Sequence, residues 1–358
     1  MHICNNPSCH NPLHCFLPPH VIDRLTESED PEIRRLAIDA KASAAAARAV
    51  RSTLATMPMM AAIPSPAGTK YRLVYNAENR RFPLPGTLVR SEGDPPVTDE
   101  AVNEAYDYSG VTYDFYKDIF GRNSLDNRGM SLISSVHFGS RENNAFWTGD
   151  QMLYGDGDGR LFISFTKAID VVAHELTHGV ITNTSNLKYE LQSGALNEHF
   201  ADAMGAMVKQ KYLNQTVDRA DWLNGDAIMG PGTTAKSLRT FKEGKAYEND
   251  PLLDTDPQPK HMRDFVVLPN DPLNDNGGVH INSGIPNHAF YRVALEIGGN
   301  AWDKTGKIWY QTLLNLNIDS EFQEAASMTH MVAGSMFGAG SLEQQAVKNG
   351  WNAVGITV

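Results

Sequence analysis

The stretch VVAHELTHGV, residues 171–180, constrains this chain more than any other feature of its sequence. His174 and His178 are four residues apart, so on a helix both imidazoles project from one face and can occupy adjacent corners of a metal's coordination sphere. Glu175 lies about 100° around such a helix from His174, close enough to hold a water beside the metal. The stretch therefore predicts a helix that carries two metal ligands and a glutamate placed to hold a water beside the metal.

A second motif, SGALNEHFADAMGAM at residues 193–207, places Glu198 and Asp202 one turn apart on another predicted helix. Two histidines and one glutamate leave the fourth tetrahedral position of a zinc ion open for water, which distinguishes catalytic from structural zinc. Asp202 is suited to accept a hydrogen bond from the non-ligating nitrogen of a zinc-bound histidine. Together the two motifs predict one catalytic zinc ion held by His174, His178 and Glu198.

The composition is that of an ordinary globular protein, with 41% hydrophobic and 20% charged residues in a chain of 358. This length allows two or three domains, each with its own core. The formal net charge of -11 disfavours binding to nucleic acid or to an anionic membrane. No run approaches the ~18 apolar residues of a membrane span, and residues 1–25 lack the basic and then apolar segments of a Sec signal.

The pattern of the sequence changes along the chain. Residues 21–54 have a helical period, and residues 71–161 contain short β-like runs with one predicted helix near 98–119. A strand-rich part followed by a helix-rich part predicts an α+β architecture of two domains, with the site in the cleft between them. The helical periods after residue 168 cover 168–184, 193–213, 284–298, 303–316, 320–337 and 341–350.

Four motifs, ENNAFWTGDQMLYGDGDG, HELTH, SGALNEHFAD and DNGGVHINSGI, occur in the order found in one known family. Over residues 70–358 the chain resembles the thermolysin-like neutral zinc metalloproteases. The metzincins are excluded, because Ile181 and Thr184 stand where that family has a glycine and a third histidine. The stretch VYNAENRRFPLPGTLVRSEGD and the leaderless start are similar to the protealysin branch, whose members carry a short propeptide.

The resemblance implies a thermolysin-like two-domain fold and a zinc endopeptidase that cleaves on the N-terminal side of apolar residues. It assigns zinc to His174, His178 and Glu198, and the role of general base to Glu175. The other catalytic residues implied are the oxyanion-stabilising His280 and Tyr189, and Asp275 and Asp202, which orient histidines. The implied substrate-binding residues are Asn144, Ala145, Trp147, Arg239, Phe162, Val171 and Leu238, with Phe165 beside the same apolar pocket.

The resemblance also implies a division of the chain into functional segments. We expect a propeptide over residues 1–55, a linker with the processing site over 56–69, a β-rich catalytic domain over 70–181 and a helical catalytic domain over 182–358. The expected partners are polypeptide substrates and the chain's own propeptide, which acts as an intramolecular inhibitor of a latent zymogen. The family resemblance implies secretion, by leaderless export or after a cytoplasmic stage, since no Sec signal is visible.

The sequence argues against a double calcium site of the kind found in some relatives. Relatives with a double calcium site place carboxylates around the helix that follows the third zinc ligand, and here Asp170, Asp221 and Asp226 remain. Lys209 and Leu223 occupy two of the other carboxylate positions, and an ammonium cannot bind calcium, which takes oxygen ligands. We expect Lys209 to take the place of an ion by bridging carboxylates, and the protein to depend only weakly on calcium.

Two alternatives remain open from the sequence. In the first, the chain is a catalytically silent zinc-binding scaffold, and the presence of Glu175, Tyr189 and His280 argues against this. In the second, the functional site is a metal-binding module at the N-terminus. All three cysteines lie in the first fifteen residues, in HICNNPSCHNPLHC, but their spacing fits no common zinc pattern. In a propeptide, Cys15 or His14 is a possible zinc ligand, and blockage of an apolar subsite by Phe16 or Leu17 is the other possibility.

Overall fold

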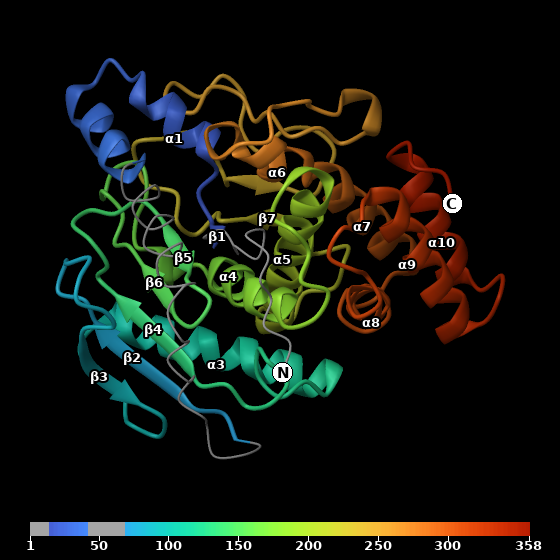
Figure 1. Cartoon of the computed structure of the whole chain (residues 1–358), viewed down its shortest axis with the longest axis horizontal. Helices are drawn as coiled ribbons and strands as arrows, with labels where there is room; N and C mark the ends of the chain where they lie inside the picture. Colours follow the sequence, from blue (N-terminus) through green and yellow to red (C-terminus); the bar gives the residue numbers. More distant parts are fainter. Residues whose placement is uncertain (1–13, 42–68) are drawn as a thin grey trace, which may run out of the picture.

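The computed structural model describes residues 14–41 and 69–358 (Figure 1). Within these residues, the strand-rich half of the protein is built on one mixed sheet. The six strands lie in the order β1-β5-β6-β4-β2-β3. β2 pairs in parallel with β4, and β4 with β6, whereas the other neighbours are antiparallel. The strands span β1 His14–Cys15, β2 Arg72–Asn76, β3 Thr87–Ser91, β4 Leu132–Val136, β5 Ala145–Trp147 and β6 Met152–Tyr154.

Helix α3, Glu100–Phe120, packs against β2, β4 and the first helix of the C-terminal half. It begins at Asp99, whose carboxylate accepts hydrogen bonds from the backbone N–H groups of Ala101 and Val102. It ends at Gly121, whose φ of 69° is a left-handed conformation that glycine adopts without strain. The helix therefore joins the sheet to the helical half.

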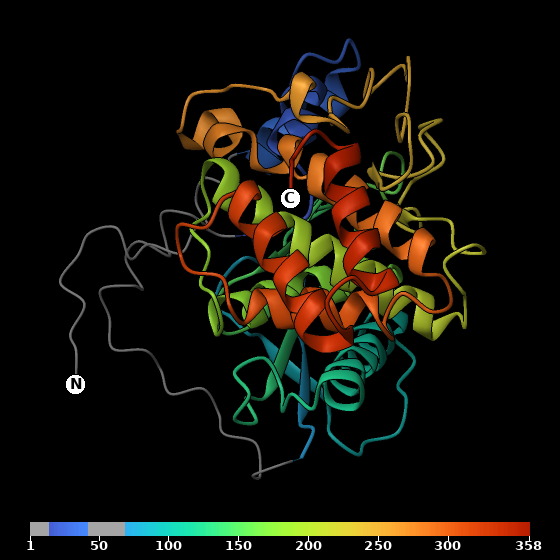
Figure 2. The same cartoon turned by 90° about the vertical axis from the view of Figure 1, so that its right-hand side faces the viewer.

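The helical half is centred on α4, Ile169–Thr182, in which residues 169–181 are all buried. α4 packs along α5, Leu191–Tyr212, and both lie between the sheet and an outer layer of helices drawn in orange and red (Figure 2). The outer helices are α6 Asp275–Asn282, α7 Gly284–Ile297, α8 Thr305–Leu313, α9 Phe322–Phe337 and α10 Leu342–Ala353. Smaller elements are η1 Phe165–Lys167, β7 Leu223–Asn224, β8 Arg239–Thr240, η2 Met262–Asp264 and η3 Pro272–Asn274.

The predicted α+β architecture is confirmed, and each helix predicted after residue 168 is present to within a few residues. The prediction of one helix over 21–54 is wrong. The structure has α1, Pro19–Thr26, and a second helical segment that begins at residue 31, and residues 42–54 lie outside the description. Pro31 disfavours helical geometry in the residue before it, and the Asp30 carboxylate caps the second helix by accepting from the N–H groups of Glu32 and Ile33.

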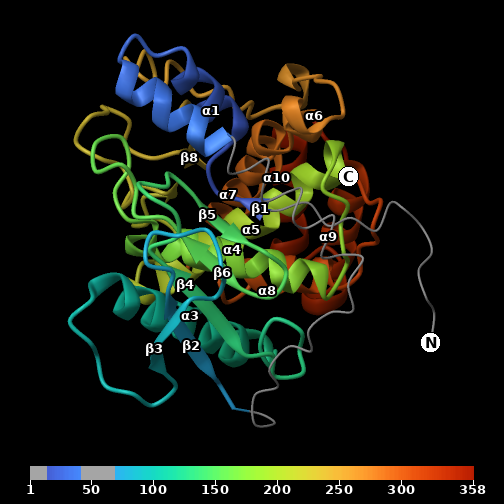
Figure 3. The ribbon, with the colours of Figure 1, turned by 60° about the vertical axis from the view of Figure 1, so that its left-hand side comes forward.

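Residues 14–41 lie against the rest of the chain (Figure 3). β1 extends the sheet by pairing with β5, and α1 buries Val21, Ile22 and Leu25. Two ion pairs at the margin, Arg160–Asp30 at 2.5 Å and Arg141–Glu32 at 2.6 Å, join this segment to the sheet half. These residues lie within the segment 1–55 that the sequence predicts to be a propeptide, and we call residues 14–41 the prosegment from here on.

No helix within residues 14–41 and 69–358 is both long enough and apolar enough to cross a membrane. Most of the expected linker and processing region, residues 56–69, lies outside the described part of the chain, so its boundaries stay a prediction.

Candidate active site

Two histidines of α4 and one glutamate of α5 converge in the interior of the protein. His174 Nε2 and His178 Nε2 are 3.1 Å apart, and the two oxygens of Glu198 lie 3.5 Å and 3.4 Å from them. All three side chains are fully buried. Within the described residues, this is the one group of His, Cys, Asp and Glu side chains arranged to hold a metal ion. The three ligands predicted from the sequence therefore meet at one point.

The polar contacts of the two rings fit a cation at this point. His178 Nδ1 lies 2.8 Å from Asn197 Oδ1, and His174 Nδ1 lies 2.9 Å from a carboxylate oxygen of Asp202, so each ring places its proton on Nδ1. Both Nε2 atoms then present lone pairs to each other, and Glu198 Oε2 is buried without a hydrogen-bond partner. Two imidazoles and one carboxylate are the donor set of a catalytic zinc.

Glu175 lies on α4 beside the ligands. One oxygen accepts a 2.9 Å hydrogen bond from the backbone N–H of Trp147, while the other is buried without a hydrogen-bond partner. Burial and the neighbouring Glu198 carboxylate raise the pKa of Glu175 well above its usual range. A carboxylate that is anchored through one oxygen, with its pKa raised, is suited to take up a proton through the other.

His280 and Tyr189 face the ligand group from α6 and from the loop before α5. Asp275 holds His280 through a 2.6 Å contact to Nδ1 and a 2.8 Å hydrogen bond from the backbone N–H. His280 Nε2 lies 3.1 Å from the Tyr189 hydroxyl and 3.6 Å from Glu198. Burial lowers the pKa of His280, but Asp275 and Glu198 outweigh it and raise the pKa to about 9. Two hydrogen-bond donors thus lie beside the metal ligands.

Asp202 connects the ligand His174 to Arg239. Arg239 donates to both oxygens of Asp202, at 2.9–3.0 Å, and Asn287 donates to one of them at 2.8 Å. Burial raises the pKa of Asp202, but Arg239 and His174 outweigh it and hold the pKa well below its usual range. Asp202 therefore stays ionised, and it fixes the position of both His174 and Arg239.

The prosegment runs through this site in an extended conformation. The Phe16 N–H donates to the Ala145 carbonyl at 3.2 Å, and the Leu17 N–H donates to Asn144 Oδ1 at 2.9 Å. Arg239 Nη1 donates to the Phe16 carbonyl at 3.1 Å. Three of the residues predicted to bind substrate thus bind a peptide of the same chain.

The Phe16 side chain occupies the apolar interior next to the metal ligands. Its ring centroid is 5.1 Å from that of His174, and the Arg239 guanidinium carbon lies 4.3 Å from the ring centroid. A Cβ added at Gly225 would meet the ring at 2.7 Å, so the ring fits closely. The residues predicted to line the apolar pocket are buried in the same core as Phe16: Phe162, Phe165, Val171 and Leu238.

The Cys15 side chain points to the other side of the strand. It packs with Phe138, Phe146 and Leu153, and its Sγ donates to the Leu17 carbonyl at 3.5 Å. The side chain beside His174 is therefore that of Phe16, and the Cys15 thiol lies in a separate apolar cluster. Trp147 pairs in register with residue 14 through β5, but its own N–H is used to hold Glu175.

Sequence reasoning missed three polar residues that hold the site together. Asn197 accepts from His178 Nδ1 and donates to the Leu187 carbonyl. Its position directly before Glu198 is the one sequence feature that could have pointed to this role. Asn287 and Gln258 come from distant parts of the chain, and Gln258 donates to the His280 carbonyl at 2.8 Å. No local pattern marks these last two residues, because their partners are distant in sequence.

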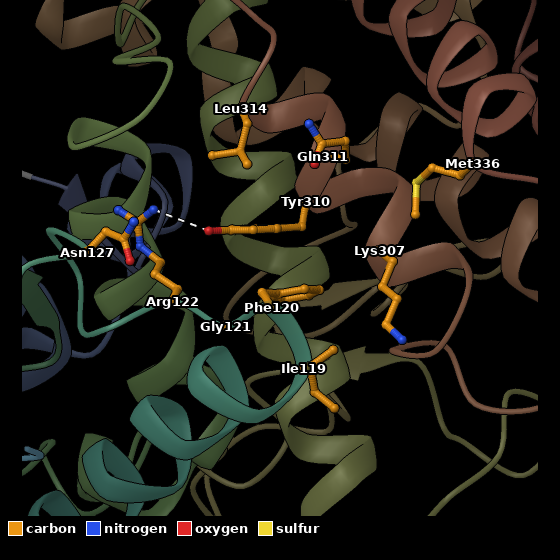
Figure 4. Close-up of a pocket in the computed structure, with 10 residues that line it drawn as sticks. All are labelled: Ile119, Phe120, Gly121, Arg122, Asn127, Lys307, Tyr310, Gln311, Leu314 and Met336. Carbon is orange, nitrogen blue, oxygen red and sulfur yellow. Dashed lines mark hydrogen bonds between the residues drawn. The ribbon is translucent and has the colours of Figure 1, made fainter. Parts of the chain in front are cut away.

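A surface pocket of about 320 Å³ lies elsewhere, where the end of α3 meets α8 (Figure 4). Phe120 and Tyr310 stack there with their centroids 4.2 Å apart, and Arg122 donates to the Tyr310 hydroxyl at 3.3 Å. None of the residues that line it belongs to the metal site. The pocket therefore marks a contact between the two halves, whereas the site itself is filled by the prosegment.

A mixed sheet, a central helix with two histidines and a glutamate from the next helix define a zinc metallopeptidase. The family described as thermolysin metallopeptidase matches the chain twice, with its catalytic domain over residues 67–182 and its alpha-helical domain over residues 185–356. This chain belongs to the thermolysin metallopeptidase family.

Individual relatives are also proteases. Protease PrtS of Photorhabdus sp. (strain Az29) is 50% identical over 293 residues, which cover 81% of this chain and 77% of that protein. An extracellular metalloprotease of Pectobacterium carotovorum subsp. carotovorum is 48% identical, over 82% of this chain and 83% of its own. The solved structure of the precursor of protealysin, a metalloproteinase from Serratia proteamaculans, matches with a TM-score of 0.86 and 43% identity, over 96% of this chain and 100% of that one. The predicted resemblance to the protealysin branch is confirmed, and the chain is a metalloendopeptidase.

Proposed function

We propose that this zinc endopeptidase is made as a latent zymogen and cleaves peptide bonds on the N-terminal side of apolar residues. The observation that supports the proposal is the position of Phe16 in the site. Its backbone is hydrogen-bonded to Ala145 and Arg239, and its ring lies beside His174. A peptide bound in this way occupies the space that a substrate needs, and the apolar surroundings of Phe16 favour a similar side chain in a substrate.

Each residue of the site has a separate role in the proposed hydrolysis. His174, His178 and Glu198 would hold a zinc ion, which supplies a Lewis acid for the carbonyl and lowers the pKa of water to about 7. Glu175 takes the proton from the attacking water through its free oxygen. His280 and Tyr189 donate to the carbonyl oxygen as it gains negative charge. Asp275 and Asp202 are positioning residues, which fix His280 and His174.

We assign substrate binding to residues from several parts of the site. Asn144 and the Ala145 backbone bind an extended peptide along β5, and Arg239 binds the carbonyl of the residue after the scissile bond. Phe162, Phe165, Val171 and Leu238 form the apolar surroundings that select this residue. Trp147 contributes indirectly, through its hydrogen bond to Glu175. We propose that the enzyme acts after secretion, as the name of the extracellular Pectobacterium relative suggests.

Purified full-length protein tests both parts of this proposal. Casein added to fresh enzyme should be cleaved only after a lag, because the prosegment first has to leave the site. Chelation of the metal should abolish the cleavage, and added zinc should restore it. N-terminal sequencing should find the new terminus between about Arg51 and Lys70 at the end of the lag. Full activity from the first minute, with Met1 still present, would refute latency, and proteolysis that resists chelation would refute the zinc mechanism.

A buried lysine supports the proposed weak dependence on calcium. Lys209 Nζ lies 2.5 Å from Asp226, 3.2 Å from Asp221, 3.7 Å from Asp170 and 3.1 Å from the Leu223 carbonyl oxygen. Burial lowers the pKa of Lys209, but the three carboxylates outweigh it and raise the pKa above its usual range. An ammonium ion thus sits among oxygen atoms of the kind that bind calcium.

Lys209→Ala should destabilise the protein by about 3–5 kcal/mol, because it leaves buried and partly buried carboxylates without their counter-charge. Thermal unfolding at constant zinc, with and without calcium, measures the effect. We expect calcium to change the midpoint of the wild type by less than about 10 °C, and to raise that of the variant more. Lys211→Ala, at an exposed position of the same helix, is the matched control. A larger calcium response in the wild type would contradict the proposal.

A further inference from the structure

The prosegment is bound in one defined register, and this register identifies one peptide bond. The carbonyl oxygen of Cys15 lies 3.1 Å from His280 Nε2, and the next carbonyl, that of Phe16, accepts from Arg239 at 3.1 Å. The N–H between these carbonyls, that of Phe16, donates to Ala145 at 3.2 Å. Both ends of the Cys15–Phe16 peptide group are therefore fixed.

The metal ligands lie beside this same peptide group. His280 Nε2, which contacts the Cys15 oxygen, is 3.6 Å from Glu198 and 3.1 Å from the Tyr189 hydroxyl. On the other side of the bond, the Phe16 ring is 5.1 Å from the ring of His174. The Phe16 carbonyl faces the Arg239–Asp202 pair instead. Of the two carbonyls, only that of Cys15 faces the donors that stabilise a developing oxyanion.

We propose that the prosegment is bound as a substrate and that the enzyme cleaves its own chain between Cys15 and Phe16. This inference rests on the proposed peptidase function. Water adds to the Cys15 carbonyl carbon and the C–N bond to Phe16 breaks. Both protons of the water pass to the Phe16 nitrogen, one through Glu175 and the other from the newly formed carboxyl group. The products are a carboxylate on Cys15 and an ammonium on Phe16.

This cleavage differs from the removal of residues 1–55. The remaining prosegment keeps its docking contacts after the cut, namely the buried face of α1 and the pairs Arg160–Asp30 and Arg141–Glu32. The released peptide, residues 1–15, carries all three cysteines of the chain. The cut therefore frees the protein of thiols while Phe16 still occupies the site, and it yields a distinct species of residues 16–358.

Intact-mass measurement of the zinc-loaded full-length protein over time tests the inference. We expect the species 16–358 to appear before any chain that begins between residues 51 and 70. Its rate should not change on tenfold dilution, because the bond is held in the site of its own molecule. Glu175→Gln protein should show no such species. If zinc-loaded protein loses residues 1–55 without passing through 16–358, the inference is overturned.

Two variants test the register. Phe16→Asp places a carboxylate in the apolar surroundings of Phe16, and should slow formation of the shortened species at least 100-fold. Cys15→Ser changes a side chain that points away from the metal ligands, and should alter the rate by less than threefold. Equal rates for Phe16→Asp and the wild type would overturn the register.

Casein cleavage in the same samples separates this inference from the proposed function. Chelator-sensitive cleavage of casein with an intact Cys15–Phe16 bond would overturn the inference and leave the peptidase function standing. Absence of both reactions in zinc-loaded protein would overturn the proposed function as well.

Discussion

Glu175→Gln is expected to lower kcat for peptide hydrolysis by about 10²- to 10⁴-fold while the protein keeps one zinc ion per chain. Glutamine retains the hydrogen bond from the Trp147 N–H, so the side chain should stay in place. It cannot take up a proton at neutral pH, and the base is lost. Because none of the three ligands changes, zinc affinity should be close to that of the wild type.

Steady-state kinetics on a short peptide and zinc analysis of the same preparation measure these two effects. Glu296→Gln, an exposed glutamate on α7, makes the same chemical change away from the site and should leave both unchanged. Loss of zinc in proportion to loss of activity would show that Glu175 acts as a ligand, and an active variant with bound zinc would remove it from the role of base.

Replacement of a zinc ligand is expected to have the second large effect. His178→Ala or Glu198→Ala leaves two protein ligands, which hold zinc poorly, so the dialysed protein should contain almost none. Asn197→Ala leaves all three ligands and removes the partner of His178 Nδ1, together with the hydrogen bond to the Leu187 carbonyl. That variant should weaken zinc binding by about 10- to 100-fold, which is typical of outer hydrogen-bond partners.

Competition with a chelator of known affinity ranks the variants, and we expect the order wild type, Asn197→Ala, His178→Ala. The measurement needs no activity, so it separates metal binding from catalysis. Retention of one zinc ion by both His178→Ala and Glu198→Ala would show that the metal lies elsewhere. Equal zinc affinity in Asn197→Ala and the wild type would remove Asn197 from the support of the site.

Most helices could be predicted from the sequence because a helical pattern depends only on residues that are close together in the chain. A helix turns every 3.6 residues, so the spacing of His174 and His178 implies a shared face in any fold that keeps the segment helical. α6 was missed for the opposite reason. Its first turn runs through Asn276, Gly277 and Gly278, all with positive φ, so neither helical period nor a capping pattern marks it.

The N-terminal segment shows where local reasoning ends. Its prolines and cysteines suggested a rigid blocking segment or a metal module, and either Cys15 or Phe16 was a possible contact of the zinc ligands. A strand turns alternate side chains to opposite faces, so a shift of one residue exchanges the two. Pairing with β5 and the contacts of Arg239 with Phe16 decide this register, and both partners lie more than a hundred residues away.

The donor set of the site could be predicted from the sequence: two histidines one turn apart, a glutamate on the following helix, and a further glutamate between the histidines. These follow from helix periodicity and from the donors that zinc prefers. The packing of distant segments establishes that Asp202 joins His174 to Arg239, that Asn287 and Gln258 support the site, and that the Cys15–Phe16 bond lies beside His280. Such contacts depend on how distant segments pack against one another, and no local pattern encodes that packing.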